Sequence, residues 1–348
     1  MEGMKFIKGA LKVIAAGMVS IIILCVLLCF YSITPVHEDN PRGNTDYVWP
    51  ANSIWVKLTE GIAFGRFDAD GYNNKKVIDD PDIIVLGSSH FEATEVMQNE
   101  NAPYLLAQKL NGRYTVYNMA ISGHDFYRVC GYIQSNLELY DTIPKVLIIE
   151  TFTVKLSPER VDAALSSSVD RQSSYSKGII GLLQRIPFFR SVYHQMEEGL
   201  LQLFVPGLNK AVADDPEAIE TEKEKEISVD KATYEKLFSY FKDLEEKYGT
   251  QIIIIYHPTE ELMADGSVYF NRNVYPRVFK QCADKYEISF IDMTDRFERM
   301  YYEDHHVAHG FCTGKLAYGH LNKYGHAVMA EELYNEIINL EEGGELCK

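Results

Sequence analysis

The sequence predicts an α/β fold, a parallel sheet between layers of helices, preceded by one membrane-spanning helix. Short apolar runs without polar alternation are typical of parallel strands that are covered on both faces. Helical stretches alternate with these runs, which is typical of a parallel α/β sheet. The span is predicted by a third observation, an uncharged apolar segment from Val13 to Ile33.

The predicted strands and helices alternate from about residue 81 onward. The strands are expected at Asp82–Leu86, Thr115–Met119, Val146–Ile149, Gln251–Tyr256 and Ile288–Ile291. The helices are expected at residues 100–110, 125–140, 230–248, 272–285 and 323–340. Crossovers between parallel strands are right-handed, and ligands bind at the carboxyl ends of the strands. Functional residues are therefore expected at that edge of the sheet.

The N-terminal segment at 13–33 has the length and the flanking charges of a signal anchor. A helix of about 20 apolar residues crosses hydrocarbon that is ~30 Å thick. Three lysines precede the segment and acidic residues follow it, so the positive-inside rule leaves residues 1–12 in the cytoplasm. A cleaved signal peptide is the alternative, but no small-residue cleavage motif follows. We expect a single-pass protein of the cell membrane, anchored in the bilayer, with its C-terminal domain extracytoplasmic.

The rest of the chain divides into a stalk and lead-in at 34–80, an α/β domain at 81–340 and a tail at 341–348. An insertion at about 155–229 interrupts the domain. It contains an amphipathic stretch and ends in a dense acidic run, which favours a lid, a partner-binding element or a solvated loop. The net charge of −16 argues against extensive binding of nucleic-acid phosphates.

Three short segments bring reactive residue types to the same edge of the predicted sheet. Ser89 follows the first strand in VLGSSH, and Gly123 follows the second strand in NMAISGHD. His320 precedes the last helix in GHLNKYGH. A serine nucleophile needs an adjacent base, and the negative charge that develops on a carbonyl oxygen needs preorganised donors. These residues are therefore the parts of acyl-transfer chemistry.

The same segments resemble blocks I, II and V of the SGNH (GDSL-like) hydrolases and acyltransferases, in family order across residues 81–340. The resemblance implies a flavodoxin-like three-layer α/β/α sandwich. It also implies Ser89 as the nucleophile, Gly123 as an oxyanion donor and His320 as the base. No cofactor and no metal is expected for this chemistry.

Two positions depart from the family pattern. Block III supplies an oxyanion-donor Asn, but the segment here is ETFT. Thr151 and Thr153 are the candidate replacements, and a donor from elsewhere in the chain is the alternative. Block V has Asp three residues before the His, but that position is Ala317 here. Asp304 is a candidate for the orienting acid; a backbone carbonyl or no partner are the alternatives. Four polar residues are expected around the pocket, as substrate contacts or as ordinary loop residues: His90, Asn118, His124 and His257.

The resulting hypothesis is a serine-dependent O-acyltransferase or esterase that acts on acyl, above all acetyl, esters of a cell-envelope polysaccharide. A membrane-bound acyl-export protein is a candidate partner. The first alternative is a non-catalytic, membrane-anchored binding or assembly protein on the same fold. A metal-dependent esterase that uses the histidines of residues 304–309 is the second. The enzyme hypothesis requires Ser89 Oγ and His320 to come within about 3 Å of each other.

Overall fold

The structure, a computed structural model, describes residues 2–31, 35, 37–58, 60–166, 229–270 and 272–346. The chain forms two compact units, and the larger one spans 37–174 and 226–348. Most of the insertion that was predicted at 155–229 lies outside the described residues, including its amphipathic stretch and its acidic run. The described start of that insertion forms helix α5 (Pro158–Leu165).

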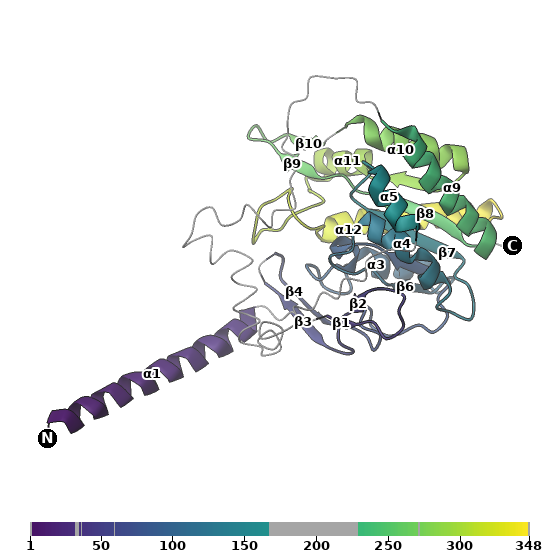
Figure 1. Ribbon diagram of the computed structural model, residues 1–348. Coiled ribbons are helices and arrows are strands. Elements are labelled where there is room, and N and C mark those ends of the chain that lie inside the picture. Colours follow the sequence, from purple (N-terminus) through teal and green to yellow (C-terminus); the bar gives the residue numbers. More distant parts are fainter. Residues whose placement is uncertain are drawn as a thin grey trace. The chain divides into compact units, whose positions relative to one another are not determined.

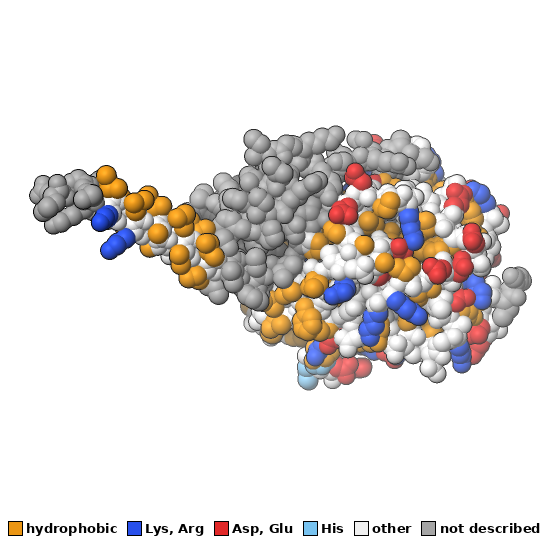
Figure 2. Space-filling model, turned by 90° about the horizontal axis from the view of Figure 1, so that it is seen from below, with side chains coloured by type: hydrophobic (Ala, Val, Ile, Leu, Met, Phe, Trp, Pro, Cys, Tyr) orange, Lys and Arg blue, Asp and Glu red, His pale blue; other side chains and the backbone are white. Residues whose placement is uncertain are grey.

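The described part of the smaller unit includes one long helix, α1 (Glu2–Tyr31). Its segment Ile7–Leu24 is long and apolar enough to cross a membrane, with a mean hydropathy of 2.0. None of this segment is buried, and apolar side chains cover most of the helix face that is visible in Figure 2. A core helix of a globular protein would instead bury its apolar stripe. A membrane anchor and a signal sequence both have these properties.

Five parallel strands form the central sheet of the larger unit. They are β5 (Ile83–Leu86), β6 (Val116–Asn118), β7 (Val146–Thr151), β8 (Gln251–Tyr256) and β11 (Ser289–Asp292). Their order is β11-β8-β7-β5-β6, and every neighbouring pair is parallel. Numbered along the chain, this is the flavodoxin-like order 2-1-3-4-5. The predicted fold class is confirmed, and each strand lies within two residues of its expected bounds.

Helices cover both faces of this sheet (Figure 1). Successive strand residues point to opposite faces, so Ile84 and Leu86 join one core cluster while Ile83 and Val85 join the other. The first cluster includes residues of α4 (Phe126–Leu137), α5, α9 (Lys231–Tyr248) and α10 (Val274–Tyr286). The second includes residues of α3 (Ala102–Leu110), α11 (Thr294–Asp304) and α12 (Lys323–Glu342). The result is a three-layer α/β/α sandwich.

Side-chain caps begin most of these helices and explain why their starts were predictable. The caps of α3, α4, α10 and α12 are Asn or Asp side chains that accept backbone N–H groups. Helix α11 was not predicted. Its N-cap, Met293, makes no side-chain capping bond, and most of its residues are charged or polar. Only Thr294, Phe297 and Met300 of that helix are buried, which is a weak periodic signal.

The segment that was predicted as a stalk and lead-in, 34–80, belongs from residue 37 onward to the larger unit. It contains two hairpins, β1 (Glu38–Asp39) with β2 (Tyr47–Val48), and β3 (Ile54–Lys57) with β4 (Ala63–Arg66). A third hairpin, β9 (Glu260–Leu262) with β10 (Val268–Phe270), follows β8. Both tryptophans of the lead-in are buried in a small core with Ala63 and Phe67. This apolar burial is the reason that the lead-in folds with the sheet.

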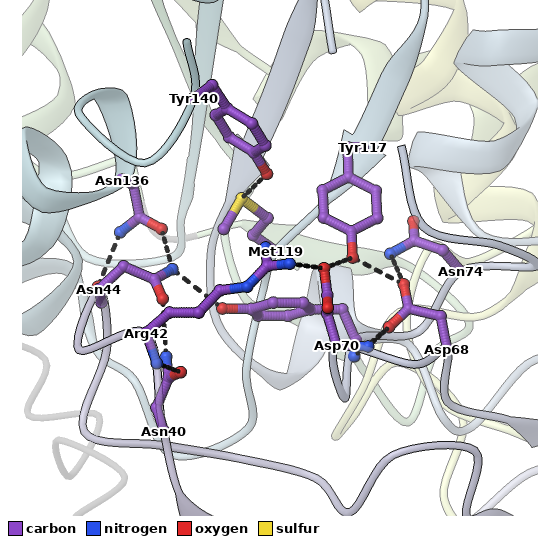
Figure 3. A network of polar contacts seen from close by, with 11 residues as sticks. Asn40, Arg42, Asn44, Asp68, Asp70, Asn74, Tyr117, Met119, Asn136 and Tyr140 are labelled. Carbon is purple, nitrogen blue, oxygen red and sulfur yellow. Dashed lines mark hydrogen bonds and ion pairs between the residues drawn. The ribbon is translucent and has the colours of Figure 1, made fainter. Parts of the chain in front are cut away.

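A polar network attaches the lead-in beside the edge strand β6 (Figure 3). Asp68 accepts a hydrogen bond from the Tyr117 hydroxyl at 2.8 Å, and Arg42 pairs with Asp70 at 2.9 Å. The Asn74 side chain bonds to both the N–H and the carbonyl of Asn118, at 3.0 and 2.9 Å. Backbone groups of an edge strand need such partners, because no further strand pairs with them.

Candidate active site

Ser89 lies at the carboxyl edge of the sheet, where β5 passes into the short helix α2 (Ser89–Glu92). The strand order reverses between β5 and β7, and in such sheets ligands bind outside the strand ends at this point. The turn requires a glycine, because a Cβ at Gly87 would lie 2.6 Å from Glu150 Oε2. The Glu150 oxygen instead accepts bonds from Ser88 N at 2.7 Å and Ser88 Oγ at 2.9 Å. The strand end of β7 therefore fixes the turn that presents Ser89.

His320 and Ser89 are within hydrogen-bond distance. The His320 Nε2 atom lies 2.9 Å from Ser89 Oγ, although 231 positions separate the two residues. The enzyme hypothesis required these two side chains to come within about 3 Å of each other, and they do. Helix α12 holds His320 in place, because the Asn322 side chain accepts the N–H groups of Tyr324 and Gly325 and so caps the helix.

The carboxylate that contacts His320 is that of Glu60, and not that of the predicted Asp304. Glu60 Oε2 lies 2.8 Å from His320 Nδ1, and Glu60 Oε1 accepts the His320 backbone N–H at 2.7 Å. Asp304 is exposed at the C-terminal end of α11 and makes no described contact with His320. The position that carries Asp in the resembled family, Ala317, is buried and has a positive φ of 57°. The acid thus comes from the connection between β3 and β4.

The charges around His320 favour its protonated form. Burial alone would lower the pKa of His320, but the charge of Glu95 and the hydrogen bond and charge of Glu60 outweigh burial and raise it to about 9. Burial likewise acts to raise the pKa of Glu60, but its hydrogen bond to His320 and the imidazolium charge lower it overall. Glu60 is therefore suited to stabilise the imidazolium that forms when Ser89 loses its proton.

The turn that contains Gly123 is fixed from two sides. The Glu92 carboxylate accepts the Ser122 N–H at 3.0 Å and also the Ser122 hydroxyl, while Trp49 Nε1 donates to the same carboxylate at 2.5 Å. Burial raises the pKa of Glu92 to about 7, although the hydrogen bonds from Ser122 and Trp49 act to lower it. From the other side the Tyr47 hydroxyl donates to the Ser122 carbonyl at 2.9 Å. Gly123 has a φ of +84°, and a Cβ there would lie 2.8 Å from Tyr47 Oη.

Two other predicted site residues, Asn118 and Thr151, have their side-chain polar atoms engaged within the protein. The Asn118 amide donates to the Phe91 carbonyl at 2.8 Å and accepts the Ala120 N–H at 3.1 Å, so it ties α2 to the turn after β6. Thr151 Oγ1 accepts the Thr153 N–H and donates to the Thr153 carbonyl, both at 2.9 Å. The structure thus gives Asn118 and Thr151 local structural bonds, and no described contact joins either threonine to Ser89.

The histidines of residues 304–309 do not form the cluster that the metal-dependent alternative required. His305 is the exposed C-cap of α11, and the His306 ring stacks on Tyr324 with 3.7 Å between ring centroids. His309 is buried and contacts His257 instead. Among the described residues, the histidines whose ring nitrogens gather are His90, His257 and His309.

Comparison with known proteins gives distant likenesses only. No protein-family model matches the chain, and no curated protein sequence matches it. Similar solved structures include an acetyl xylan esterase, with 13% identity, a TM-score of 0.39 and coverage of 73% of this chain and 99% of that one. The psychrotrophic esterase EstA from Pseudoalteromonas sp. has 12% identity and a TM-score of 0.37, covering 75% and 98%. An acetylxylan esterase from Geobacillus stearothermophilus has 12% identity and a TM-score of 0.36, covering 75% and 95%.

Proposed function

We propose that the protein is an extracytoplasmic, membrane-anchored serine esterase or O-acyltransferase that acts on acetyl or other acyl esters of a cell-envelope polysaccharide. The observation that carries the proposal is the hydrogen-bonded series Glu60–His320–Ser89. It supplies a nucleophile, a base and an acid that orients the base, from three separate elements. The apolar helix α1 supports a membrane location, where such polymers are made.

In the proposed mechanism His320 Nε2 accepts the Ser89 proton while Ser89 Oγ attacks the acyl carbonyl. The N–H groups of Gly123 and Ser89 stabilise the oxyanion of the tetrahedral intermediate. His320 then donates its proton to the departing alcohol oxygen, which leaves an acyl-Ser89 ester. Water releases the acyl group in an esterase, and a sugar hydroxyl accepts it in a transferase. His320 takes the proton from the attacking hydroxyl and returns it to Ser89 Oγ as the bond between Oγ and the acyl group breaks.

Labelling with a serine-reactive fluorophosphonate tests the nucleophile, because this reaction needs no acyl acceptor. We expect the full-length protein to be labelled at Ser89. Ser89→Ala should abolish labelling, and Ser267→Ala, which removes a serine outside the site, should retain it. A folded protein that is labelled equally with and without Ser89, or not at all, contradicts the proposal and favours a non-catalytic binding or assembly protein.

The route of the acyl group distinguishes the two enzyme classes. With p-nitrophenyl acetate as the donor, an esterase releases acetate to water whether or not sugar is present. A transferase instead forms O-acetylated oligosaccharide when an acceptor is added. Mass spectrometry of the oligosaccharide measures the acetyl transferred, and an acetate assay measures the acetyl hydrolysed. Together they give the ratio of transfer to hydrolysis. The same experiment with the acyl-export protein present would test that protein as the source of the acyl donor.

A further inference from the structure

A second cluster of functional side chains lies directly beside the proposed catalytic pair. His90 belongs to α2, His257 follows β8, and His309 lies in the connection between α11 and α12. One ring nitrogen from each of the three lies within 4.8 Å of the other two. His257 and His309 are buried, with 0% and 2% exposure. The His90 ring centroid is also 5.1 Å from that of His320.

Two buried carboxylates face the outer nitrogens of this cluster. Glu150 Oε1 lies 2.8 Å from His257 Nε2, and Glu260 Oε1 lies 3.3 Å from His309 Nδ1. An ionised carboxylate only accepts hydrogen bonds, so each of these outer nitrogens carries the ring N–H. The inner nitrogens, His257 Nδ1 and His309 Nε2, then present lone pairs to each other at 3.2 Å. Two facing lone pairs at this distance need a cation between them, either a proton or a metal ion.

The charge balance of the cluster favours a metal ion over a proton. Glu150 and Glu260 are only 1% and 6% exposed, and neither pairs with Lys or Arg within the described part of the chain. The second oxygen of Glu260 is buried and has no hydrogen-bond partner there. Buried charges require compensation. A divalent cation would balance both carboxylates, whereas one shared proton would balance only one.

The distance between His257 and His309 already fits zinc, and His90 lies close enough to complete the site after a small movement. With Zn–N bonds of about 2.0–2.1 Å and a tetrahedral angle, two ligand nitrogens lie about 3.3 Å apart. The inner nitrogens of His257 and His309 are already 3.2 Å apart. His90 must move toward them and give up its bond from the Leu321 N–H, which is long at 3.3 Å. The carboxylate–histidine pairs match the outer shell that orients zinc-binding histidines in proteins.

We propose that His90, His257 and His309 bind one Zn²⁺ ion, with Glu150 and Glu260 orienting His257 and His309 and one coordination position left to solvent. The segment that differs from block III of the resembled family contributes a residue to this site. At the end of β7, where the resembled family has its Gly-x-Asn-Asp segment, this chain has Glu150, which bonds to both Ser88 and His257. The ion would lie next to the nucleophile, since His90 follows Ser89 directly in α2. A metal at these three residues was not predicted from the sequence.

The test is a titration of the full-length, chelator-treated protein with ZnCl₂, followed by calorimetry and by metal analysis after dialysis. We expect one Zn²⁺ per chain. Glu260→Gln should weaken binding by about 10- to 100-fold, because it removes an orienting carboxylate. His90→Ala and His257→Ala should weaken it further. His305→Ala is the matched control, because it removes an exposed histidine outside the cluster and should leave the affinity unchanged.

Substitution with Co²⁺ gives a second readout, since visible absorption reports a tetrahedral nitrogen site. If circular dichroism shows that His257→Ala does not fold, the zinc affinity of His90→Ala tests the proposal instead. His90 is only half-buried, so its replacement should leave the fold intact. The proposal is overturned if the folded wild-type chain binds no zinc, or if His90→Ala binds it as tightly as wild type does. Ser89→Ala should bind zinc normally, so failure of the proposed catalytic function leaves this result unaffected.

Discussion

At the scale of single residues, Glu60 orients the His320 ring and, together with the charge of Glu95, raises the pKa of His320. Its two oxygens accept the backbone N–H and face the ring Nδ1 of the same histidine. In the proposed mechanism, this double contact fixes the tautomer that leaves Nε2 free to accept the Ser89 proton. The Asp at the usual block V position acts from three residues away, whereas here the contact spans 260 positions.

Glu60→Gln is predicted to lower kcat for hydrolysis of an acetyl ester by on the order of 10²- to 10⁴-fold. A glutamine has one acceptor oxygen, so it cannot serve both contacts, and it cannot stabilise the imidazolium by charge. Steady-state kinetics on purified variants measures the loss. Asp304→Asn is the control and should leave kcat within about 2-fold of wild type, since a distant surface change costs little. Equal activity of Glu60→Gln and wild type would remove Glu60 from the mechanism.

The raised pKa of His320 predicts an alkaline activity profile. A protonated His320 cannot accept the Ser89 proton, so kcat/KM should rise with pH until the pKa of about 9 and then level off. Chelator-treated protein should be used, so that no cation beside His90 changes this pKa. In Glu60→Gln the loss of negative charge should move the rising limb to lower pH. The assignment of the rise in kcat/KM to His320 would be contradicted if the rise stayed at the same pH in Glu60→Gln. It would also be contradicted if kcat/KM of the wild type had already levelled off at pH 6.5.

The sequence identifies Ser89 and His320 but not their partner, for a physical reason. Ser89 follows a strand and His320 precedes a capped helix, and both elements have clear periodicity and local signals. Glu60 lies in an irregular connection with no such pattern, and only the packing of a hairpin brings it to His320. The histidine-rich run at 304–309 was misleading for the same reason, because His309 pairs with His257 across 52 positions and not with its neighbours in sequence.

At the scale of elements, two loops meet to form the Glu60–His320 contact. The β3–β4 connection carries Glu60 and Gly61, and the Gly61 N–H bonds to Thr313 Oγ1 at 3.1 Å in the loop before α12. That loop also contains Gly319, whose φ is +84°. A Cβ on Gly319 would lie 2.1 Å from Glu60 Oε1, so this glycine permits the close approach of the two loops.

Gly319→Ala is therefore predicted to separate Glu60 from His320. Activity should fall by about 10²-fold, the effect expected for a displacement near 1 Å in a catalytic group. The strained backbone should cost ~1–2 kcal/mol in the free energy of unfolding. Kinetics and urea denaturation measure the two effects. Gly314→Ala is the control from the same loop, because a Cβ there meets nothing within 4 Å. If both variants behave alike, close packing of the loops is not required.

At the scale of the whole molecule, the sequence predicts the alternation of strands and helices, but it carries no signal that the lead-in belongs to the same compact unit as the sheet. The buried strands leave a strong signal, since both faces are apolar. The lead-in is rich in Pro, Gly and Asn, which are typical of a linker, and its two tryptophans fit a place over the core of the domain at least as well as a lipid interface. The structure buries both of them, to 6% and 1% exposure. The face of the larger unit in Figure 2 shows acidic and basic side chains interspersed, although the net charge of the chain is −16.

This organisation predicts where the chain can be shortened. A chain that starts at residue 37 keeps every described residue of the larger unit, so it should be soluble, unfold cooperatively and react with the fluorophosphonate at Ser89. A chain that starts at residue 81 loses Glu60 and the small core of Trp49, Trp55, Ala63 and Phe67. Burial of each large side chain stabilises the fold by about 1.5–3 kcal/mol, and a domain has only about 5–15 kcal/mol in total.

The shorter chain should therefore be unfolded or aggregated, and any folded fraction should lack activity. Circular dichroism with thermal unfolding reports folding, and fluorophosphonate labelling reports the site. A variant of the longer chain with Glu60→Gln separates the two causes, because it keeps the buried core and loses only the acid. If the chain that starts at residue 81 folds and reacts like the longer one, the lead-in is a linker after all. The site would then be complete within the sandwich alone.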